Sequence, residues 1–335
     1  MSEVQQTDII IVGAGPVGMF AAFYAGLREL DVTVIESLAS VGGQVANLYP
    51  QKQILDIAGF VGTNGRELIA NLEMQMNQFQ PEVKLNTTVL DVIANADGFE
   101  VQTNHGTWQA KAVLVATGKG AFEPRRLPAE IENDTPHIHY FLNDVADFTD
   151  RRVLVAGGGD SAVDMATLLA TVASEVHLTH RRENFRAMER AVTELAASDV
   201  VLQTPYTIEN IELQHDETLK VTLALVRSDE KQDIIVDDIM VNYGFLSENK
   251  IVAGWDIQPT VERQKFVVDQ TMETSVPGVF AIGDVAGYPG KAELIATGFG
   301  EAPTAINSIM GRIYPDRATV LHSSGLVIEN GKIKH

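Results

Sequence analysis

The sequence contains no cysteine. Disulfide bonds, thiolate metal sites, cysteine nucleophiles and redox-active dithiols are therefore excluded from the chemistry of this chain. The absence also fits a reducing compartment, where disulfides are rare. We expect the protein to be cytoplasmic.

Basic residues are scarce as well. Lys and Arg number 25 against 45 Asp and Glu, which gives a formal net charge of −20 and a pI of about 4.7. Such a surface repels phosphate backbones and anionic lipid, so nucleic acid and membrane surfaces are poor partners. A local basic patch can still bind a phosphate.

A convincing membrane span is also missing. The uncharged run at residues 9–27 is nearly long enough to cross a bilayer. Two acidic residues precede it, however, where a signal peptide has a basic region. Gly13, Gly15 and Pro16 interrupt it. We therefore expect a buried strand, a turn and a buried helix over this run.

The remaining composition is that of an ordinary globular protein. The chain has 335 residues, of which 45% are hydrophobic and 21% are charged. These values exclude a disordered chain, a collagen-like fibre and a coiled coil. The length predicts two domains and is sufficient for a sizeable core.

A nucleotide-binding fingerprint lies near the N-terminus. The apolar letters IIIV predict a central parallel strand and are followed by GAGPVG, which matches G-x-G-x-x-G. Gly13 permits the tight turn, Gly15 lets a pyrophosphate approach the backbone, and Gly18 lets helix and strand pack closely. A second strand, residues 32–35, ends at Glu36, whose carboxylate can accept bonds from two ribose hydroxyls. The alternative is an ordinary glycine turn, but strand, helix, second strand and acid are all in register.

The same pattern returns 144 residues later, at Gly157 in the letters GGGDSA. The counterpart of Glu36, 23 residues after the first glycine, is His180, which is followed by Arg181 and Arg182. An acid there repels a 2′-phosphate, whereas arginines bind one through charge-assisted bonds. We therefore expect NADP(H) in the second site and a dinucleotide with a free 2′-hydroxyl in the first. The alternative is that the two arginines form a solvated charge pair.

Two dinucleotide sites on one chain change the functional interpretation. A single nicotinamide cofactor needs only one site. An FAD site beside an NADP site implies hydride transfer between nicotinamide and flavin.

Other segments suit a flavoprotein. A buried strand ending in ATG at residues 116–118 predicts a return of the chain near the flavin. A later strand ends at Gly283 and Asp284. In a flavoprotein this motif places Asp284 on the ribitol chain of the cofactor. Taken alone, Asp284 is better interpreted as a turn residue after a strand. A helix is expected from Lys291 to Met310, either with its N-terminal dipole near the flavin pyrimidine or as a plain core helix.

Two short motifs leave alternatives open. The letters GGQ at residues 42–44, followed by Tyr49, suit the approach of a flavin ring, and equally suit a glycine-rich turn with a half-buried tyrosine. His137 and His139 alternate on an extended segment, but a metal site needs more ligands. We expect these histidines to be structural or on the surface, and we expect no metal.

Together these motifs resemble the ferredoxin–NADP+ reductases of the thioredoxin-reductase-like type, over essentially the whole chain. The matching segments are the two fingerprints, GGQ, ATG, HRRENFRA at 180–187, AIGDVAG at 281–287 and IATGFGEAP at 295–303. Thioredoxin reductases also have a C-x-x-C pair shortly before the second fingerprint, where this chain reads YFLND at 140–144. Dithiol–disulfide exchange through the protein itself is therefore impossible.

The resemblance implies site residues for both cofactors. FAD contacts are implied at Glu36, Gln44, Tyr49, Val89, Phe122, Asp284 and Ser324, with Ser323 as an alternative to Ser324. Tyr49 is implied to stack on one flavin face. His322, from the tail at 311–335 of the other subunit of a homodimer, is implied to cover the other face. NADP contacts are expected at Gly157, Gly159, Ser161, His180, Arg181, Arg182 and Arg186.

The expected fold is α/β, with two Rossmann-like dinucleotide-binding domains. The FAD domain is expected to comprise residues 1–115 and 245–335, and the NADP domain, residues 116–244, is inserted into it. The links near residues 118–120 and 243–245 contain glycine and can act as a hinge.

The expected activity moves electrons between NADPH and a one-electron carrier, a ferredoxin or flavodoxin, through FAD. No acid or base is expected, because hydride transfer depends chiefly on orientation. An acidic ferredoxin needs a local basic docking area, with candidates Lys119, Arg125, Arg126 and Arg186. Two alternatives remain: a flavin enzyme that reduces another acceptor such as an external disulfide, and a non-enzymatic flavin redox sensor.

Overall fold

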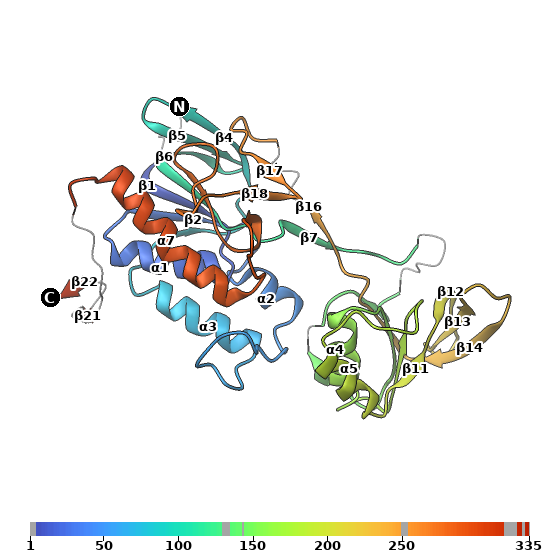
Figure 1. Cartoon of the computed structure of the whole chain (residues 1–335). Helices are drawn as coiled ribbons and strands as arrows, with labels where there is room; N and C mark the ends of the chain where they lie inside the picture. Colours follow the sequence, from blue (N-terminus) through green and yellow to red (C-terminus); the bar gives the residue numbers. More distant parts are fainter. Residues whose placement is uncertain are drawn as a thin grey trace. The chain divides into compact units, whose positions relative to one another are not determined.

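The computed structural model describes residues 5–128, 135–142, 144–248, 254–317, 327–329 and 332–334. The chain divides into two compact units, Met1–Ala121 with Ser247–His335, and Phe122–Leu246 (Figure 1). The second unit is thus inserted into the first. The two changeovers fall a few residues after the positions expected from the sequence.

The first unit contains a seven-stranded sheet in the order β3-β2-β1-β6-β5-β4, with β19 also paired to β6. Its strands are β1 (Gln5–Val12), β2 (Val32–Ile35), β3 (Glu82–Lys84), β4 (Val89–Asn95), β5 (Gly98–Thr103), β6 (Gly106–Val115) and β19 (Val279–Ala281). Strands β3, β2, β1, β6 and β19 are parallel, and β4 and β5 add an antiparallel extension. Where residues 9–12 of β1 pair with residues 112–115 of β6, both strands are buried, which explains their uninterrupted apolar sequence there.

Helices α1 (Pro16–Leu27), α3 (Gly65–Met76) and α7 (Ile295–Ile313) lie together on one face of this sheet (Figure 1). The short helix α2 (Gly43–Leu48) precedes α3. Helix α3 starts with a capping box, in which Asn64 accepts from the amide of Glu67 at 2.9 Å and Glu67 accepts from the amide of Asn64 at 3.2 Å. The uncharged run near the N-terminus is therefore a buried strand, a turn and a packed helix, as expected.

Helix α7 starts later than the sequence suggested. It begins at Ile295, whose amide donates to Asp56 Oδ2 at 3.1 Å, and not at Lys291. Lys291 lies in the preceding segment, where its ammonium group donates to the carbonyl oxygen of Gly283 at 2.6 Å. Asp56 is 239 residues from Ile295 and Gly283 is 8 residues from Lys291, so neither contact lies at helical spacing and helical periodicity gave no sign of them.

The second unit contains a five-stranded sheet in the order β11-β10-β9-β15-β8, in which every pair is parallel. Its strands are β8 (Ile138–His139), β9 (Arg152–Ala156), β10 (Glu175–Thr179), β11 (Val201–Gln203) and β15 (Asp238–Val241). Helices α4 (Asp160–Leu169) and α5 (Glu189–Ala196) pack beside each other, α4 against β9 and β10. This strand–helix alternation is a second Rossmann-like arrangement.

The remaining strands form small sheets. Strands β12 (Tyr206–Leu213), β13 (Leu219–Leu225) and β14 (Lys231–Val236) make an antiparallel sheet in the second unit, and β7 (Ala121–Pro124) pairs with β16 (Phe245–Glu248). Strands β17 (Val261–Glu262), β18 (Lys265–Val267) and β20 (Ala286–Gly287) form another sheet, and β21 (Val327–Glu329) pairs with β22 (Lys332–Lys334). Across the described ranges, no helix combines the length and apolar character that a bilayer crossing requires.

Candidate functional site

The first glycine-rich loop joins β1 to α1 and is shaped by close backbone packing. Gly13 has a φ of +106°, and a Cβ atom there would lie 2.6 Å from the carbonyl oxygen of Ala116. A Cβ atom at Gly18 would lie 2.0 Å from the carbonyl oxygen of Gly13. A larger residue at either position would push α1 away from the strands, so packing alone explains these two glycines.

Gly15 is different, because nothing in the described part of the chain requires glycine there. Its φ of −70° and ψ of 177° suit any residue, and a Cβ atom would meet no heavy atom within 4 Å. Helix α1 begins at the next residue without a side-chain cap and without an acid in its first turn. Its unpaired amides and the positive end of its dipole suit a phosphate, so this loop fits a dinucleotide.

The carboxylate of Glu36 lies against this loop. Glu36 is buried, and its Oε2 accepts from the amide of Ala14 at 2.8 Å. Its Oε1 accepts from the amide of Leu38 at 2.9 Å and from the hydroxyl of Ser37 at 3.3 Å. A carboxylate has about four acceptor positions, so Glu36 retains capacity for a further donor such as a ribose hydroxyl.

The GGQ segment and Tyr49 belong to the same neighbourhood. The amide of Gly42 donates to the carbonyl of Ala14 at 2.8 Å, and α2, which carries the half-buried Gln44, starts at the next residue. Burial, followed by the carboxylates of Asp284 and Asp56, raises the pKa of Tyr49 to about 12. Tyr49 is therefore neutral at physiological pH and lies within electrostatic reach of Asp284.

Asp284 belongs to the C-terminal part of the chain, yet it lies beside the first glycine-rich loop. It follows Gly283, which has a φ of +69° and would place a Cβ atom 3.5 Å from the side chain of Val17, at the start of α1. A Cβ atom at Gly298, in the first turn of α7, would lie 2.4 Å from Val17. The starts of α1 and α7 thus meet beside the Gly283–Asp284 turn. Nearby, the buried hydroxyl of Thr117 has no partner in the described residues, which leaves it available to a ligand.

The structure brings together Gly13, Gly15, Gly18, Glu36, Gln44, Tyr49 and Asp284, but not every expected FAD residue. Val89 is buried at the start of β4, two residues after Thr87, whose amide donates to the carbonyl of Glu36 at 2.9 Å. The backbone of Phe122 is in β7. His322, Ser323 and Ser324 lie outside the described residues.

The second glycine-rich loop repeats the geometry of the first. A Cβ atom at Gly157 would lie 2.4 Å from the carbonyl oxygen of Asn242, as the one at Gly13 approaches Ala116. Gly159 caps α4 in an extended conformation, and a Cβ atom there would approach only the carbonyl oxygen of Arg186, at 3.9 Å. The first turn of α4 continues with the exposed Ser161. This loop therefore leaves the same kind of space for a phosphate.

His180 forms one wall of the second loop. A Cβ atom at Gly158 would lie 2.2 Å from His180 Nδ1, and the imidazole stacks on Phe185 with the ring centroids 5.7 Å apart. Burial, followed by the charges of Arg181, Arg182 and Arg186, lowers the pKa of His180. The imidazole is therefore neutral near pH 7, and three guanidinium groups lie close enough to influence it.

These three arginines are not neutralised. Arg181, Arg182 and Arg186 are exposed, and none has a hydrogen-bond or carboxylate partner for its side chain among the residues that the structure describes. The backbone of Arg186 is tied to the loop, since its amide donates to the carbonyl of Gly158 at 2.7 Å. In a chain with a net charge of −20, three such cations beside the open position at Gly159 favour an anionic ligand.

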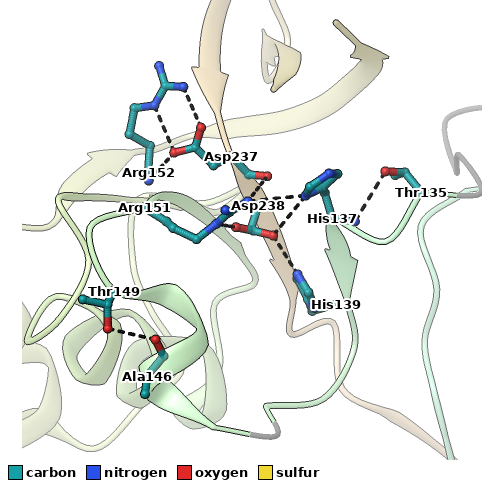
Figure 2. A network of polar contacts seen from close by, with 9 residues as sticks. All are labelled: Thr135, His137, His139, Ala146, Thr149, Arg151, Arg152, Asp237 and Asp238. Atoms are coloured by element: carbon teal, nitrogen blue, oxygen red, sulfur yellow. Dashed lines mark hydrogen bonds and ion pairs between the residues drawn. The ribbon is translucent and has the colours of Figure 1, made fainter. Parts of the chain in front are cut away.

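The histidines at 137 and 139 belong to a separate polar network at the opposite edge of the second sheet (Figure 2). Asp238 accepts from His139 Nε2 at 2.8 Å and from Arg151 Nε, and His137 Nδ1 lies 3.5 Å away. Beside it, Arg152 binds Asp237 through two side-chain bonds at 2.7 and 3.2 Å. The described residues contain no group of three or more candidate ligands that could hold a metal ion. The two histidines are structural.

The Asp238 network predicts a pH-dependent loss of stability. Burial tends to raise the pKa of the Asp238 carboxyl, but hydrogen bonds from His139 and Arg151 outweigh it and hold the pKa below its ordinary value of 3.8. The charged form thus stabilises the fold above that value and loses its contribution as the pH falls through the folded pKa. Asp238→Asn should lower the free energy of unfolding of the second unit by about 2–3 kcal/mol near pH 7.

Urea unfolding near pH 7 and again near pH 3 tests this, because the gap between parent and variant should shrink at the lower pH. Asp233→Asn is the matched control, since Asp233 forms an exposed pair with Lys220 at 3.0 Å and its replacement should cost much less stability than that of Asp238. An equal gap for Asp238→Asn at both pH values would show that its charge is not what stabilises the sheet.

The proposed docking cations are divided between the two units. Lys119 belongs to the first unit and pairs with Glu293 at 3.2 Å. Arg125, Arg126 and Arg186 belong to the second unit, where the guanidinium of Arg126 lies 5.0 Å from the ring centroid of Tyr140. The carrier-docking surface therefore stays a prediction.

Sequence reasoning missed the buried ion pair of Lys291 and Glu301 behind Gly283. One signal was available. Glu301 falls on the apolar side of α7, between the buried residues Gly298 and Ala302. A charged residue on a buried face requires a partner, and its presence there could have been noted as an anomaly.

Comparison with known proteins supports the same architecture. A family profile described as "Pyridine nucleotide-disulphide oxidoreductase" matches residues 7–308. "Ferredoxin--NADP reductase" of Leuconostoc mesenteroides is 51% identical over 330 residues, which cover 97% of this chain and 98% of that protein. The protein of the same name from Lactiplantibacillus plantarum is 48% identical over 322 residues, covering 95% of this chain and 97% of that protein.

Among solved structures, thioredoxin reductase of Lactococcus lactis superposes with a TM-score of 0.76 at 24% identity, covering 92% of this chain and 99% of that one. The bacillithiol disulfide reductase of Bacillus cereus gives a TM-score of 0.72 at 19% identity, covering 92% of this chain and all of that one, 100%. At these identities the likeness concerns the fold alone.

Proposed function

This chain belongs to the pyridine nucleotide-disulphide oxidoreductase family, and we propose that it is a ferredoxin–NADP reductase that uses FAD. The observation that carries the proposal is the pair of similar loops with different chemistry beside them. The first loop has the carboxylate of Glu36, and the second has His180 with three arginines whose side chains have no partner among the described residues. The relatives at about half identity over nearly the whole chain support the same activity.

The residues of the first loop fit FAD. Gly15 and the start of α1 would hold its pyrophosphate, and Glu36 would accept from the adenosine ribose. Asp284 would bind the ribitol chain and Tyr49 would stack on the ring. FAD, when bound, accepts two electrons from NADPH and passes them on singly.

The residues of the second loop fit NADPH. Gly159 and the start of α4 bind its pyrophosphate, and Arg181, Arg182 and Arg186 bind the 2′-phosphate. His180 is neutral and stands where the first loop has the acid Glu36, so no negative charge at this position repels the 2′-phosphate. The chain's task is then orientation of the two cofactors, and no side chain has to move a proton.

The lack of cysteine decides between acceptors. The family name refers to disulphides, yet this chain has no thiol that could relay electrons to one. A one-electron carrier needs no such relay, which favours ferredoxin or flavodoxin over an external disulfide. The cytoplasmic location expected from the sequence stays a prediction.

An anaerobic titration tests the function. We expect the purified protein to be yellow with one FAD per chain, to bleach with one equivalent of NADPH, and to regain its colour when oxidised ferredoxin or flavodoxin is added. A protein that stays colourless when supplied with FAD would contradict the flavin. Bleaching followed by reoxidation with a disulfide, but not with either carrier, would favour the disulfide reductase, and no turnover with any acceptor would favour a sensor.

The C-terminal tail is proposed to cover the flavin of the other subunit in a homodimer, with His322 over the ring and Ser324 in contact. Helix α7 starts beside the Gly283–Asp284 turn and, with 19 residues, runs about 28 Å away from it. Tyr314 is then anchored by a bond of 2.8 Å to Asp8 in β1, five residues before the first glycine of the loop. The eight residues from there to His322 span at most about 29 Å when fully extended. Reaching back to the flavin of the same chain would therefore leave almost no slack, which supports a second subunit.

A chain that ends at Pro315 tests the tail. We expect it to keep FAD, perturb the flavin spectrum, change NADPH–ferredoxin turnover and reoxidise faster in dissolved oxygen, because one ring face is uncovered. Sedimentation of the full chain should show a dimer. Identical spectra, turnover and oxygen reactivity in the two proteins would remove His322 and Ser324 from the site.

A further inference from the structure

Behind the Gly283–Asp284 turn, two charged side chains are buried as a pair. Lys291 Nζ lies 2.7 Å from Glu301 Oε1, and only 5% and 4% of the two side chains are exposed. Removing both charges from water is costly, and two apolar residues of similar size often stabilise a fold as well or better. Stability alone is therefore a weak reason for this pair.

The pair closes a ring around one residue. The amide of Gly283 donates to Glu301 Oε2 at 2.7 Å, and the carbonyl of Gly283 accepts from Lys291 Nζ at 2.6 Å. The hydroxyl of Tyr288 donates to Glu301 Oε1 at 2.7 Å. Both main-chain polar groups of Gly283 are thus bound by side chains that also bind each other. We call Lys291, Glu301 and Tyr288 the Gly283 clamp.

The Gly283 clamp lies directly after the last residue of this segment that is hydrogen-bonded to the sheet. The amide of Ile282 still donates to the carbonyl of Val115, at 3.0 Å, in register with β6. Gly283 then turns into the left-handed region with a φ of +69°. The clamp binds both of its polar groups and ties the turn to α7 through Glu301. The direction of the next residue, Asp284, is set by this attachment.

We propose that Lys291 and Glu301 are positioning residues for FAD, which hold Gly283 so that the carboxylate of Asp284 faces the cofactor. The inference rests on the proposed function, since it takes FAD as the ligand of the first loop. A pair of opposite charges suits this task, because it supplies an acceptor for the amide and a donor for the carbonyl without adding net charge beside Asp284.

Tyr288 completes the clamp. Burial, followed by its hydrogen bond to Glu301, raises the pKa of Tyr288 to about 12. The hydroxyl therefore stays protonated and remains a donor to Glu301 at any pH at which the enzyme works. Glu301 thus receives three donors, from Gly283, Tyr288 and Lys291, which holds its carboxylate in a single orientation.

The test replaces both charges together, so that neither is left buried alone. In the full chain, Lys291→Met with Glu301→Leu should leave the apoprotein folded with a modest loss of urea stability, because no charge is buried alone but the Gly283 amide and the Tyr288 hydroxyl lose their acceptor. Its dissociation constant for FAD, measured by quenching of FAD fluorescence, should rise about 10- to 100-fold because Gly283 loses both of its side-chain partners. The absorption bands of the bound flavin should also shift.

A second variant should have an intermediate FAD affinity, and it provides a test if the first variant does not fold. Lys291→Met with Glu301→Gln keeps a carbonyl acceptor for the amide of Gly283, so its affinity for FAD should lie between the parent and the Leu variant. A Gln variant with the affinity and spectrum of the parent would overturn the proposal.

The control is a similar arrangement at the other end of β19. There Glu273 Oε1 accepts from the amide of Gly278 at 2.6 Å and pairs with Arg312 at 3.3 Å. Glu273→Leu with Arg312→Met should leave FAD affinity unchanged. Equal losses of FAD affinity in the control and the clamp variants would reduce the clamp to a general contribution to stability and overturn the inference. A parent chain that does not bind FAD would refute the proposed function instead.

Discussion

Replacing Arg181 and Arg182 together by alanine should lower kcat/KM for NADPH by about 100- to 1,000-fold and leave kcat/KM for NADH nearly unchanged. A charge-assisted hydrogen bond contributes about 1.5–3 kcal/mol, and each 1.4 kcal/mol is a factor of ten. The two arginines are exposed, so water screens them and each contributes near the lower end. Steady-state rates with each nicotinamide cofactor and a fixed saturating acceptor give the ratio.

The structure explains why the effect should be selective. Both arginines follow β10 and lack a carboxylate partner in the described part of the chain, so their removal breaks no internal contact. NADH has no 2′-phosphate for them to bind. The backbone of the loop and the start of α4, which serve the pyrophosphate of both cofactors, stay intact.

Arg190→Ala is the matched control for the loss of charge. Arg190 is a surface residue of α5 that pairs with Glu194 at 2.8 Å, and 87% of its side chain is exposed. It should leave the preference for NADPH unchanged. If the double variant lost activity equally with NADPH and NADH, the arginines would be serving the pyrophosphate or the fold, and the assignment of the second loop to NADP would lose its main support.

The features that could be read from the sequence are local ones. The two fingerprints depend on glycines and strands within about thirty residues of each other. Counting along both repeats was enough to place His180 at the position of Glu36. The structure puts both residues against their glycine loops, through the bond from Ala14 to Glu36 and the contact of Gly158 with His180.

The features that could not be read are long-range. Lys291 and Glu301 meet at Gly283 because α7 folds back beside β19, and no local pattern encodes that distance. The late start of α7 has the same origin, since Asp56 caps it from far away in the sequence. Asp238 likewise meets His139 only because β8 joins the edge of the second sheet. Each needs a tertiary partner that spacing does not reveal.

Gly15 is the one glycine of the first fingerprint that no packing contact in the described residues explains. Gly15→Ala should leave the apoprotein folded but weaken FAD binding about 100- to 1,000-fold. Alanine suits the φ of −70° there, and its Cβ atom meets nothing within 4 Å in the described chain. When FAD is present, the methyl group keeps the pyrophosphate from the amides at the start of α1. One or two charge-assisted bonds of about 1.5–3 kcal/mol are then lost.

Two further substitutions distinguish a ligand effect from a folding effect. Gly18→Ala puts its Cβ atom 2.0 Å from the carbonyl oxygen of Gly13, so it should destabilise the apoprotein by about 1–3 kcal/mol or more. Gly311→Ala, at an exposed and open position near the end of α7, should stabilise the chain by up to about 1 kcal/mol and bind FAD normally. Urea unfolding of the apoproteins and FAD titration measure both quantities for each variant. If Gly15→Ala bound FAD as tightly as Gly311→Ala, the open space above Gly15 would not be where the pyrophosphate lies, and the first loop would have to bind its ligand by another route.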